Sequence, residues 1–189
     1  MAYPDSKFAL RRRLFLGLAT AFCAAPALAD VGPALLKGSV AKFNLAAARK
    51  PLPDFAFLDP QDQELKLGAW RGKTVLLNFW ATWCAPCVKE MPSLDHLQAV
   101  MGKERFVVLP LSLDGPTRSK VVPFYEDKKL GNLGIYFDKG RKAMQALDIS
   151  ILPTSILVDA EGRELGRLEG EADWDSPEAI ALMKAASGI

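Results

Sequence analysis

The chain has 189 residues, half of them hydrophobic, which is enough for one domain with a sizeable core. Its net charge is +2, but residues 1–29 hold four basic residues and one acidic residue, so the rest of the chain has 20 basic and 21 acidic residues. The basic excess is therefore confined to the N-terminus and gives no reason to expect binding to nucleic acid.

Residues 1–29 have the composition of an export signal. Three arginines, Arg11 to Arg13, precede sixteen uncharged residues that end in an Ala-x-Ala cleavage site at Ala29. The pair Arg12-Arg13 followed by Leu-Phe-Leu also resembles a twin-arginine signal. The alternative is an uncleaved anchor, although a span needs about 20 apolar residues. Both interpretations place the remaining chain outside the cytoplasmic membrane.

The rest of the chain alternates between predicted strands and helices. Residues 30–50 are expected to form an approach segment with an irregular amphipathic helix, which the prolines at 51 and 53 end. Periodicity and turn residues then predict strands at 55–57, 64–67, 74–79, 106–113, 135–137, 154–159 and 164–168. They also predict four helices: one that begins at 85, one that follows the turn at 114–116 and ends near 130, one at 141–147 and one at 177–186. This alternation predicts an α/β sandwich. Pro110 interrupts one strand pattern, so we expect a bulge or a non-bonded edge there.

Cys84 and Cys87 lie where the 74–79 strand is followed by a helix, whose apolar positions are Met91, Leu94, Leu97 and Met101. A helix N-terminus favours negative charge, so a thiolate at Cys84 should be more acidic than that of a free cysteine. Cys87 lies one turn later, close enough to attack a mixed disulfide at Cys84. The spacing therefore predicts a redox-active dithiol.

A zinc half-site or a structural bridge is the alternative for this spacing. Zinc requires two more Cys or His ligands. The chain offers only Cys23, inside the export signal, and His96, nine residues further along the same helix. We therefore expect no metal, and we expect His96 to pair with Asp95 on the surface.

The sequence FWATWCAPC at residues 79–87, followed by KEMP at 89–92, resembles the thioredoxin-like family. More narrowly, it resembles the TlpA/ResA/CcmG branch of exported or membrane-tethered thiol–disulfide oxidoreductases. Four other segments fit this branch, the last two resembling TlpA in particular: LPDF at 52–55, RGK at 71–73, PTSILVD at 153–159 and EADW at 171–174. The resemblance implies a thioredoxin fold over residues 51–189, with a central mixed β-sheet flanked by helices and an N-terminal β-hairpin extension.

The resemblance also implies roles for individual residues. Cys84 would be the attacking thiolate and Cys87 the buried resolving cysteine. Pro153 would be a cis proline opposite them, for which an ordinary trans proline at a strand entrance is the alternative. The expected substrate contacts are Trp83, Pro86 and Leu152, the last through its backbone.

Glu90 follows Cys87 by three residues, so both lie on one side of the helix, and its carboxylate could shuttle the proton of Cys87. In the ResA-like branch a glutamate at this place is an active-site residue. The alternative is a solvated charge beside Lys89. Thioredoxin has a buried aspartate where this chain has Asn78, and the missing acid favours a role for Glu90. Trp174 is expected to pack the last loop against the sheet.

Together these inferences predict a periplasmic, exported reductase of specific protein disulfides that acts as a monomer. The implied substrates are cysteine pairs in proteins that assemble the copper site of cytochrome oxidase, or in apocytochrome c. The implied electron donor is a membrane thiol reductase, and no cofactor is expected beyond the Cys84–Cys87 disulfide. Two other functions remain open: an oxidase that donates disulfides, and a non-enzymatic Cu(I) carrier with Cys84 and Cys87 as ligands.

Overall fold

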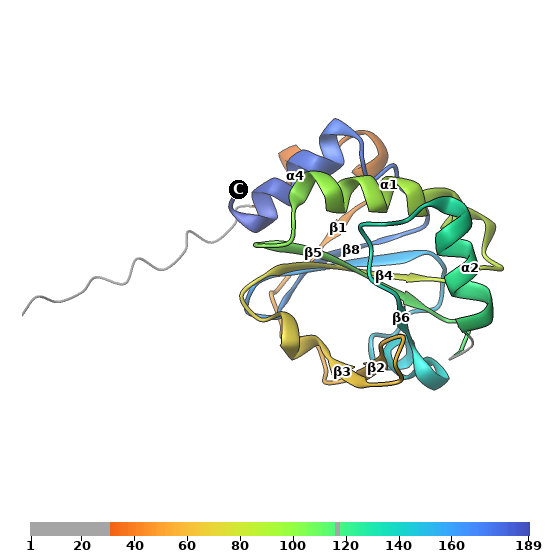
Figure 1. Ribbon diagram of the computed structural model, residues 1–189. Coiled ribbons are helices and arrows are strands. Elements are labelled where there is room, and N and C mark those ends of the chain that lie inside the picture. The colour runs from red at the N-terminus through yellow and green to blue at the C-terminus, as the bar shows by residue number, and fades with distance from the viewer. Residues whose placement is uncertain (1–30, 116–117) are drawn as a thin grey trace, which may run out of the picture.

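The computed structural model describes residues 31–115 and 118–189, so the predicted export signal lies outside the described residues. The described chain forms one sheet in the order β1-β8-β7-β4-β5-β6-β2-β3 (Figure 1). Its strands are β1 Asn44–Leu45, β2 Ala56–Leu58, β3 Glu64–Lys66, β4 Thr74–Trp80, β5 Phe106–Ser112, β6 Tyr136–Phe137, β7 Thr154–Val158 and β8 Glu164–Glu169. In this part of the chain, none of the helices has both the length and the hydropathy that a bilayer crossing requires.

The sheet is mixed, and helices flank it. The α-helices are α1 Ala85–Met101, α2 Arg118–Lys128, α3 Lys142–Ala146 and α4 Pro177–Ser187, and short 3₁₀ turns occupy Pro33–Leu35, Gly38–Val40, Leu67–Trp70 and Lys139–Arg141. Figure 1 shows α1 and α4 side by side over one face of the sheet, with α3 beside β2 on the other side. This is the predicted thioredoxin fold, and β2 and β3 form the predicted N-terminal hairpin at one sheet edge.

Strand β4 is the centre of the molecule. All seven of its residues are buried, because parallel β5 and antiparallel β7 flank it in the sheet. Four residues separate the end of β4 from the start of α1, and the predicted apolar positions of α1 are all buried: Met91, Leu94, Leu97 and Met101. The CxxC segment therefore lies between the end of a fully buried strand and the start of a helix that packs on the core.

The approach segment differs from its prediction. Instead of an amphipathic helix it contains two short 3₁₀ turns followed by β1, which pairs antiparallel with β8 at the second sheet edge. Phe43 is buried, and the approach of β1 explains why residue 166 in β8 is glycine: a Cβ there would lie 2.5 Å from the Asn44 carbonyl oxygen. Pairing with an open strand edge satisfies the backbone of a segment too short to form a stable helix.

Pro110 lies in β5 without a bulge, since the pairing with β4 continues through Asn78 opposite Pro110. The N–H of Val108 bonds to the side chain of Gln98 on α1 at 2.7 Å. Because backbone direction alternates along a strand, the nitrogen of Pro110 faces the same side as that of Val108. Strand β6 pairs with β5 only from Leu111 onward, so Pro110 withholds no ladder hydrogen bond. Of the two outcomes expected at this proline, the non-bonded edge is the one found.

Candidate active site: a CxxC disulfide at the start of helix α1

Cys84 and Cys87 form a disulfide at the N-terminus of α1. Cys84 is the N-cap residue, and its sulfur accepts a hydrogen bond from the backbone N–H of Cys87 at 3.3 Å. The sulfur therefore lies among the unpaired N–H groups of the first turn, where negative charge is stabilised. Cys84 is 7% exposed and Cys87 is fully buried, so of the two cysteines only Cys84 is accessible to another molecule.

The turn before Cys84 is held in place by the segment that directly follows β5. Asp114 accepts hydrogen bonds from the backbone N–H of Thr82 at 2.8 Å and from its hydroxyl at 2.6 Å. The N–H of Cys84 itself bonds to the carbonyl of Ala81 at 3.1 Å. These contacts fix the position of the first cysteine relative to the sheet, which a dithiol needs for ordered exchange.

The predicted substrate contacts surround Cys84. Trp83 is 61% exposed, and Pro86 and Leu152 line a depression of about 510 Å³ that also contains Cys84. The peptide bond between Leu152 and Pro153 is cis, as the resemblance implied. Within residues 31–115 and 118–189, the backbone N–H and carbonyl of Leu152 bond to no other residue. The structure thus brings the predicted contacts together at the exposed edge of the disulfide.

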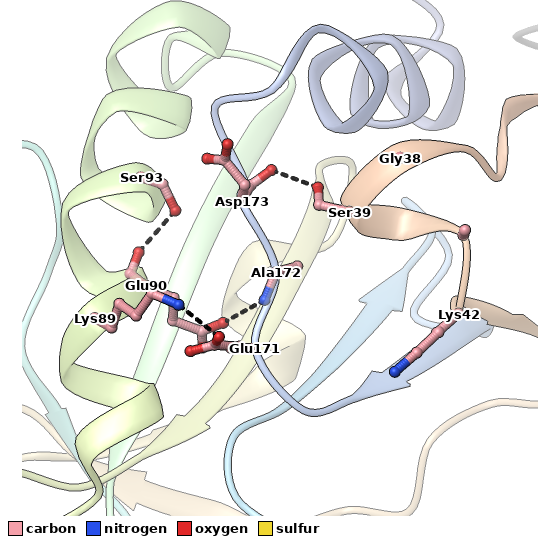
Figure 2. A pocket seen from close by; sticks show the side chains of 10 residues that line it. Gly38, Ser39, Lys42, Lys89, Glu90, Ser93, Glu171, Ala172 and Asp173 are labelled. Carbon is pink, nitrogen blue, oxygen red and sulfur yellow. Dashed lines mark hydrogen bonds and ion pairs between the residues drawn. The ribbon is translucent and has the colours of Figure 1, made fainter.

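Glu90 is buried, which rules out the alternative of a solvated charge. Its carboxylate accepts hydrogen bonds from the Asn78 side-chain amide at 2.7 Å and the Trp174 indole N–H at 3.1 Å. It also accepts one from the Ala172 N–H at 3.2 Å, which Figure 2 shows. Burial raises the pKa of Glu90 from 4.5 to about 7, against the lowering effect of these three donors, and the charge of Glu171 adds to the rise. Glu90 therefore changes protonation near neutral pH.

A second cavity gives Glu90 a route to solvent. It has a volume of about 560 Å³ and lies between α1, the loop at 171–173 and the segment at 38–42 (Figure 2). Lys89 and Glu171 form an ion pair of 2.6 Å across its mouth. Neither cysteine lines this cavity, so Glu90 and Cys84 face solvent through different openings.

Sequence reasoning missed two features of this region. Trp174 is fully buried, and the sequence did not reveal its hydrogen bond to Glu90, 84 residues away on α1. Arg141, which was not singled out, lines the depression beside Cys84.

The predicted pairing of His96 with Asp95 is wrong. His96 lies 3.2 Å from Asp175, because α1 packs against α4 and brings the loop before α4 within reach. Asp95 instead accepts hydrogen bonds from the backbone N–H groups of Asn132 and Leu133. Among the described residues, no group of three or more His, Cys, Asp or Glu side chains is arranged to hold a metal ion.

A buried CxxC pair at a strand-to-helix junction of a thioredoxin-type sheet defines a thiol–disulfide oxidoreductase. The chain is 32% identical over 141 residues to the thiol-disulfide oxidoreductase ResA of Bacillus cereus, an alignment that covers 75% of this chain and 80% of the relative. It is 33% identical over 135 residues to ResA of Geobacillus kaustophilus, covering 71% of this chain and 76% of the relative.

A Chlorobium tepidum protein, described as a thiol:disulfide interchange protein DsbE, has a similar crystal structure. The TM-score is 0.66 at 26% identity, and the match covers 76% of this chain and all of that one. The model of the AhpC/TSA family matches residues 48–163. The chain belongs to the AhpC/TSA family and is a thiol–disulfide oxidoreductase of the ResA and DsbE type.

Proposed function

We propose that this oxidoreductase works as a reductase of selected protein disulfides outside the cytoplasmic membrane. The observation that supports reduction over oxidation is the buried, ionisable carboxyl of Glu90, three residues after Cys87 on the same side of α1. A strong oxidant is one whose reduced form is stabilised. A carboxylate close to the dithiol disfavours a thiolate there, so it stabilises the reduced form less and keeps the pair reducing.

The reaction conserves electrons and protons through two exchanges. The Cys84 thiolate attacks one sulfur of the substrate disulfide, forming a mixed disulfide and releasing the other substrate sulfur as a thiolate that takes up a proton. Cys87 then gives its proton to a base and attacks Cys84, which releases the second substrate sulfur. The substrate gains two electrons and two protons, and the Cys84–Cys87 disulfide is regenerated. A membrane thiol reductase is the proposed source of the next electron pair.

The proposed substrates are cysteine pairs in proteins that assemble the copper site of cytochrome oxidase, or in apocytochrome c. The support for the first is the resemblance to TlpA at 153–159 and 171–174. The first segment directly follows Leu152, which lines the depression beside Cys84, and the second contains Ala172, whose N–H bonds to Glu90. The support for the location is the composition of residues 1–29. A cleaved signal and an uncleaved anchor would both place the domain in the periplasm.

The test uses purified oxidised candidates from both substrate classes and the reduced protein. Wild type should reduce a true substrate stoichiometrically, as counted by free thiols, and Cys87→Ser should stop at a mixed disulfide that mass spectrometry detects. Cys84→Ser, which lacks the attacking sulfur, is the matched control and should form no adduct. If neither candidate exchanges with wild type while a small disulfide does, the substrate assignment is wrong.

The reduction potential of the pair separates the reductase from its alternatives. A potential between about −270 and −200 mV supports a reductase, whereas one near −120 mV, typical of strong oxidants, supports disulfide donation. Tight Cu(I) binding that Cys84→Ser abolishes, without disulfide exchange, would instead identify a copper carrier.

A further inference from the structure

The depression beside Cys84 contains one charged side chain. Arg141 lines it together with uncharged residues only: Trp83, Ala85, Pro86, Leu113, Met144, Ser150 and Leu152. Arg141 is exposed, and its guanidinium forms no hydrogen bond or ion pair with any side chain in the described part of the chain. Arg141 is therefore a cation without a side-chain partner among the described residues, at an otherwise uncharged surface next to the reactive sulfur.

The backbone at Arg141 is strained. Its φ is +58° and its ψ is +29°, and Gly140 before it is also left-handed, with φ +69°. Glycine adopts this conformation freely, whereas a residue with a Cβ loses about 1 kcal/mol or more in it. Strain of this kind persists only where surrounding contacts impose it, and it is often found at functional positions.

Asp138 supplies those contacts. Its buried carboxylate accepts the N–H groups of Ala143 at 2.9 Å and Met144 at 2.8 Å, and its carbonyl accepts the N–H of Arg141 at 3.2 Å. The turn from 138 to 144 is thereby tied at both ends. Arg141 is held at the start of α3, in a fixed position relative to the depression.

We propose that Arg141 selects substrates with an acidic residue close to the target cysteine, by binding its carboxylate. This inference rests on the proposed reductase function. A substrate segment joined to Cys84 would cover the apolar floor of the depression, and the guanidinium offers a planar fork of N–H donors that matches a carboxylate. An acidic side chain one or two residues from the substrate cysteine provides the missing partner, while a basic side chain there is repelled.

The test measures single-turnover reduction of three otherwise identical disulfide peptides by the reduced full-length protein. The peptides place Glu, Gln or Lys beside the target cysteine. The Glu peptide should react about fivefold faster than the Gln peptide, a factor typical of an exposed ion pair near 1 kcal/mol, and the Lys peptide should react more slowly than both. Added salt should reduce the spread.

Arg141→Gln should remove the preference, and Arg141→Lys, which keeps the charge but not the fork, should retain part of it. Lys142→Gln is the matched control, because Lys142 is exposed on the same turn but does not line the depression. Equal rates for the three peptides with wild type overturn the inference and leave the reductase function standing. Equal slowing of all three peptides by Arg141→Gln also overturns it, because Arg141 would then act on Cys84. If wild type reduces none of them but oxidises their dithiol forms, the reductase function itself fails.

Discussion

Replacing Glu90 by glutamine should change how the stability of the oxidised protein depends on pH. Burial raises the pKa of Glu90 from 4.5 to about 7. Between pH 4.5 and pH 7, Glu90 is therefore protonated in the folded protein and ionised in the unfolded chain. The contribution of Glu90 to the free energy of unfolding is therefore greatest below pH 4.5, falls as the pH rises, and levels off above pH 7. The full loss corresponds to about 3 kcal/mol, most of which falls between pH 5 and pH 8.

Glutamine is a suitable replacement because the site can accept a second amide. Its carbonyl oxygen can take the N–H groups of Trp174 and Ala172, as the carboxylate does. Its amide can donate to the carbonyl oxygen of Asn78, a buried acceptor with no hydrogen-bond partner among the described residues, once the Asn78 amide turns over. The variant should therefore fold while losing the titration.

The assay is urea denaturation of the oxidised protein, followed by tryptophan fluorescence from pH 5 to pH 9, for wild type and Glu90→Gln. The free energy of unfolding of wild type should fall relative to the variant by about 2 to 3 kcal/mol over this range. The exposed pair of His96 and Asp175 is present in both proteins, so its contribution cancels in the comparison. Parallel curves for the two proteins would refute the assignment of a raised pKa to Glu90.

Two further predictions concern the stability effects of substitutions at Trp174 and at Arg141. Trp174 and Trp80 are both fully buried, but Trp174 donates to Glu90 whereas the indole N–H of Trp80 has no partner in residues 31–115 and 118–189. At pH 8, Trp174→Phe should therefore cost about 1.5 to 3 kcal/mol more in urea denaturation than Trp80→Phe, and equal losses would contradict a bond to an ionised Glu90. Arg141→Gly should raise stability by about 0.5 to 1 kcal/mol by relieving its left-handed backbone, while Arg141→Gln, which keeps a Cβ, should not. A destabilised glycine variant would show that the side chain contributes to the fold.

Local patterns in the sequence predicted most elements because their causes are local. The apolar run ending at Trp80 and the stripe from Met91 to Met101 define β4 and α1 without reference to any other segment. The approach segment was mispredicted because its structure depends on pairing with β8, more than 100 residues away. A short amphipathic stretch becomes a strand when an open edge offers partners, and periodicity alone does not show that edge.

The site divides in the same way. Cys84 and Cys87 were identified from spacing and from their place at a helix start, both of which are visible in sequence. The surroundings of Glu90 and Arg141 were not, because the partners of Glu90 come from a strand and from a distant loop, and the depression around Arg141 joins three separate segments. The protonation of Glu90 and the surroundings of Arg141 depend on contacts between distant segments, whereas the position of Cys84 at a helix start depends on local sequence alone.

Asn78 and Glu90 together explain how this chain dispenses with an acid on its central strand. The resemblance to thioredoxin places an aspartate at position 78, where an amide here donates to Glu90 at 2.7 Å. In this chain the carboxyl lies on α1 instead of on β4, and the hydrogen bond from Asn78 connects it to the strand. On the helix it follows Cys87 by one turn and reaches the cavity at 38–42 and 171–173, away from the depression around Cys84. We therefore expect a partner that covers Cys84 to leave the opening beside Glu90 uncovered, so that the carboxyl can exchange protons with solvent during the exchange reaction.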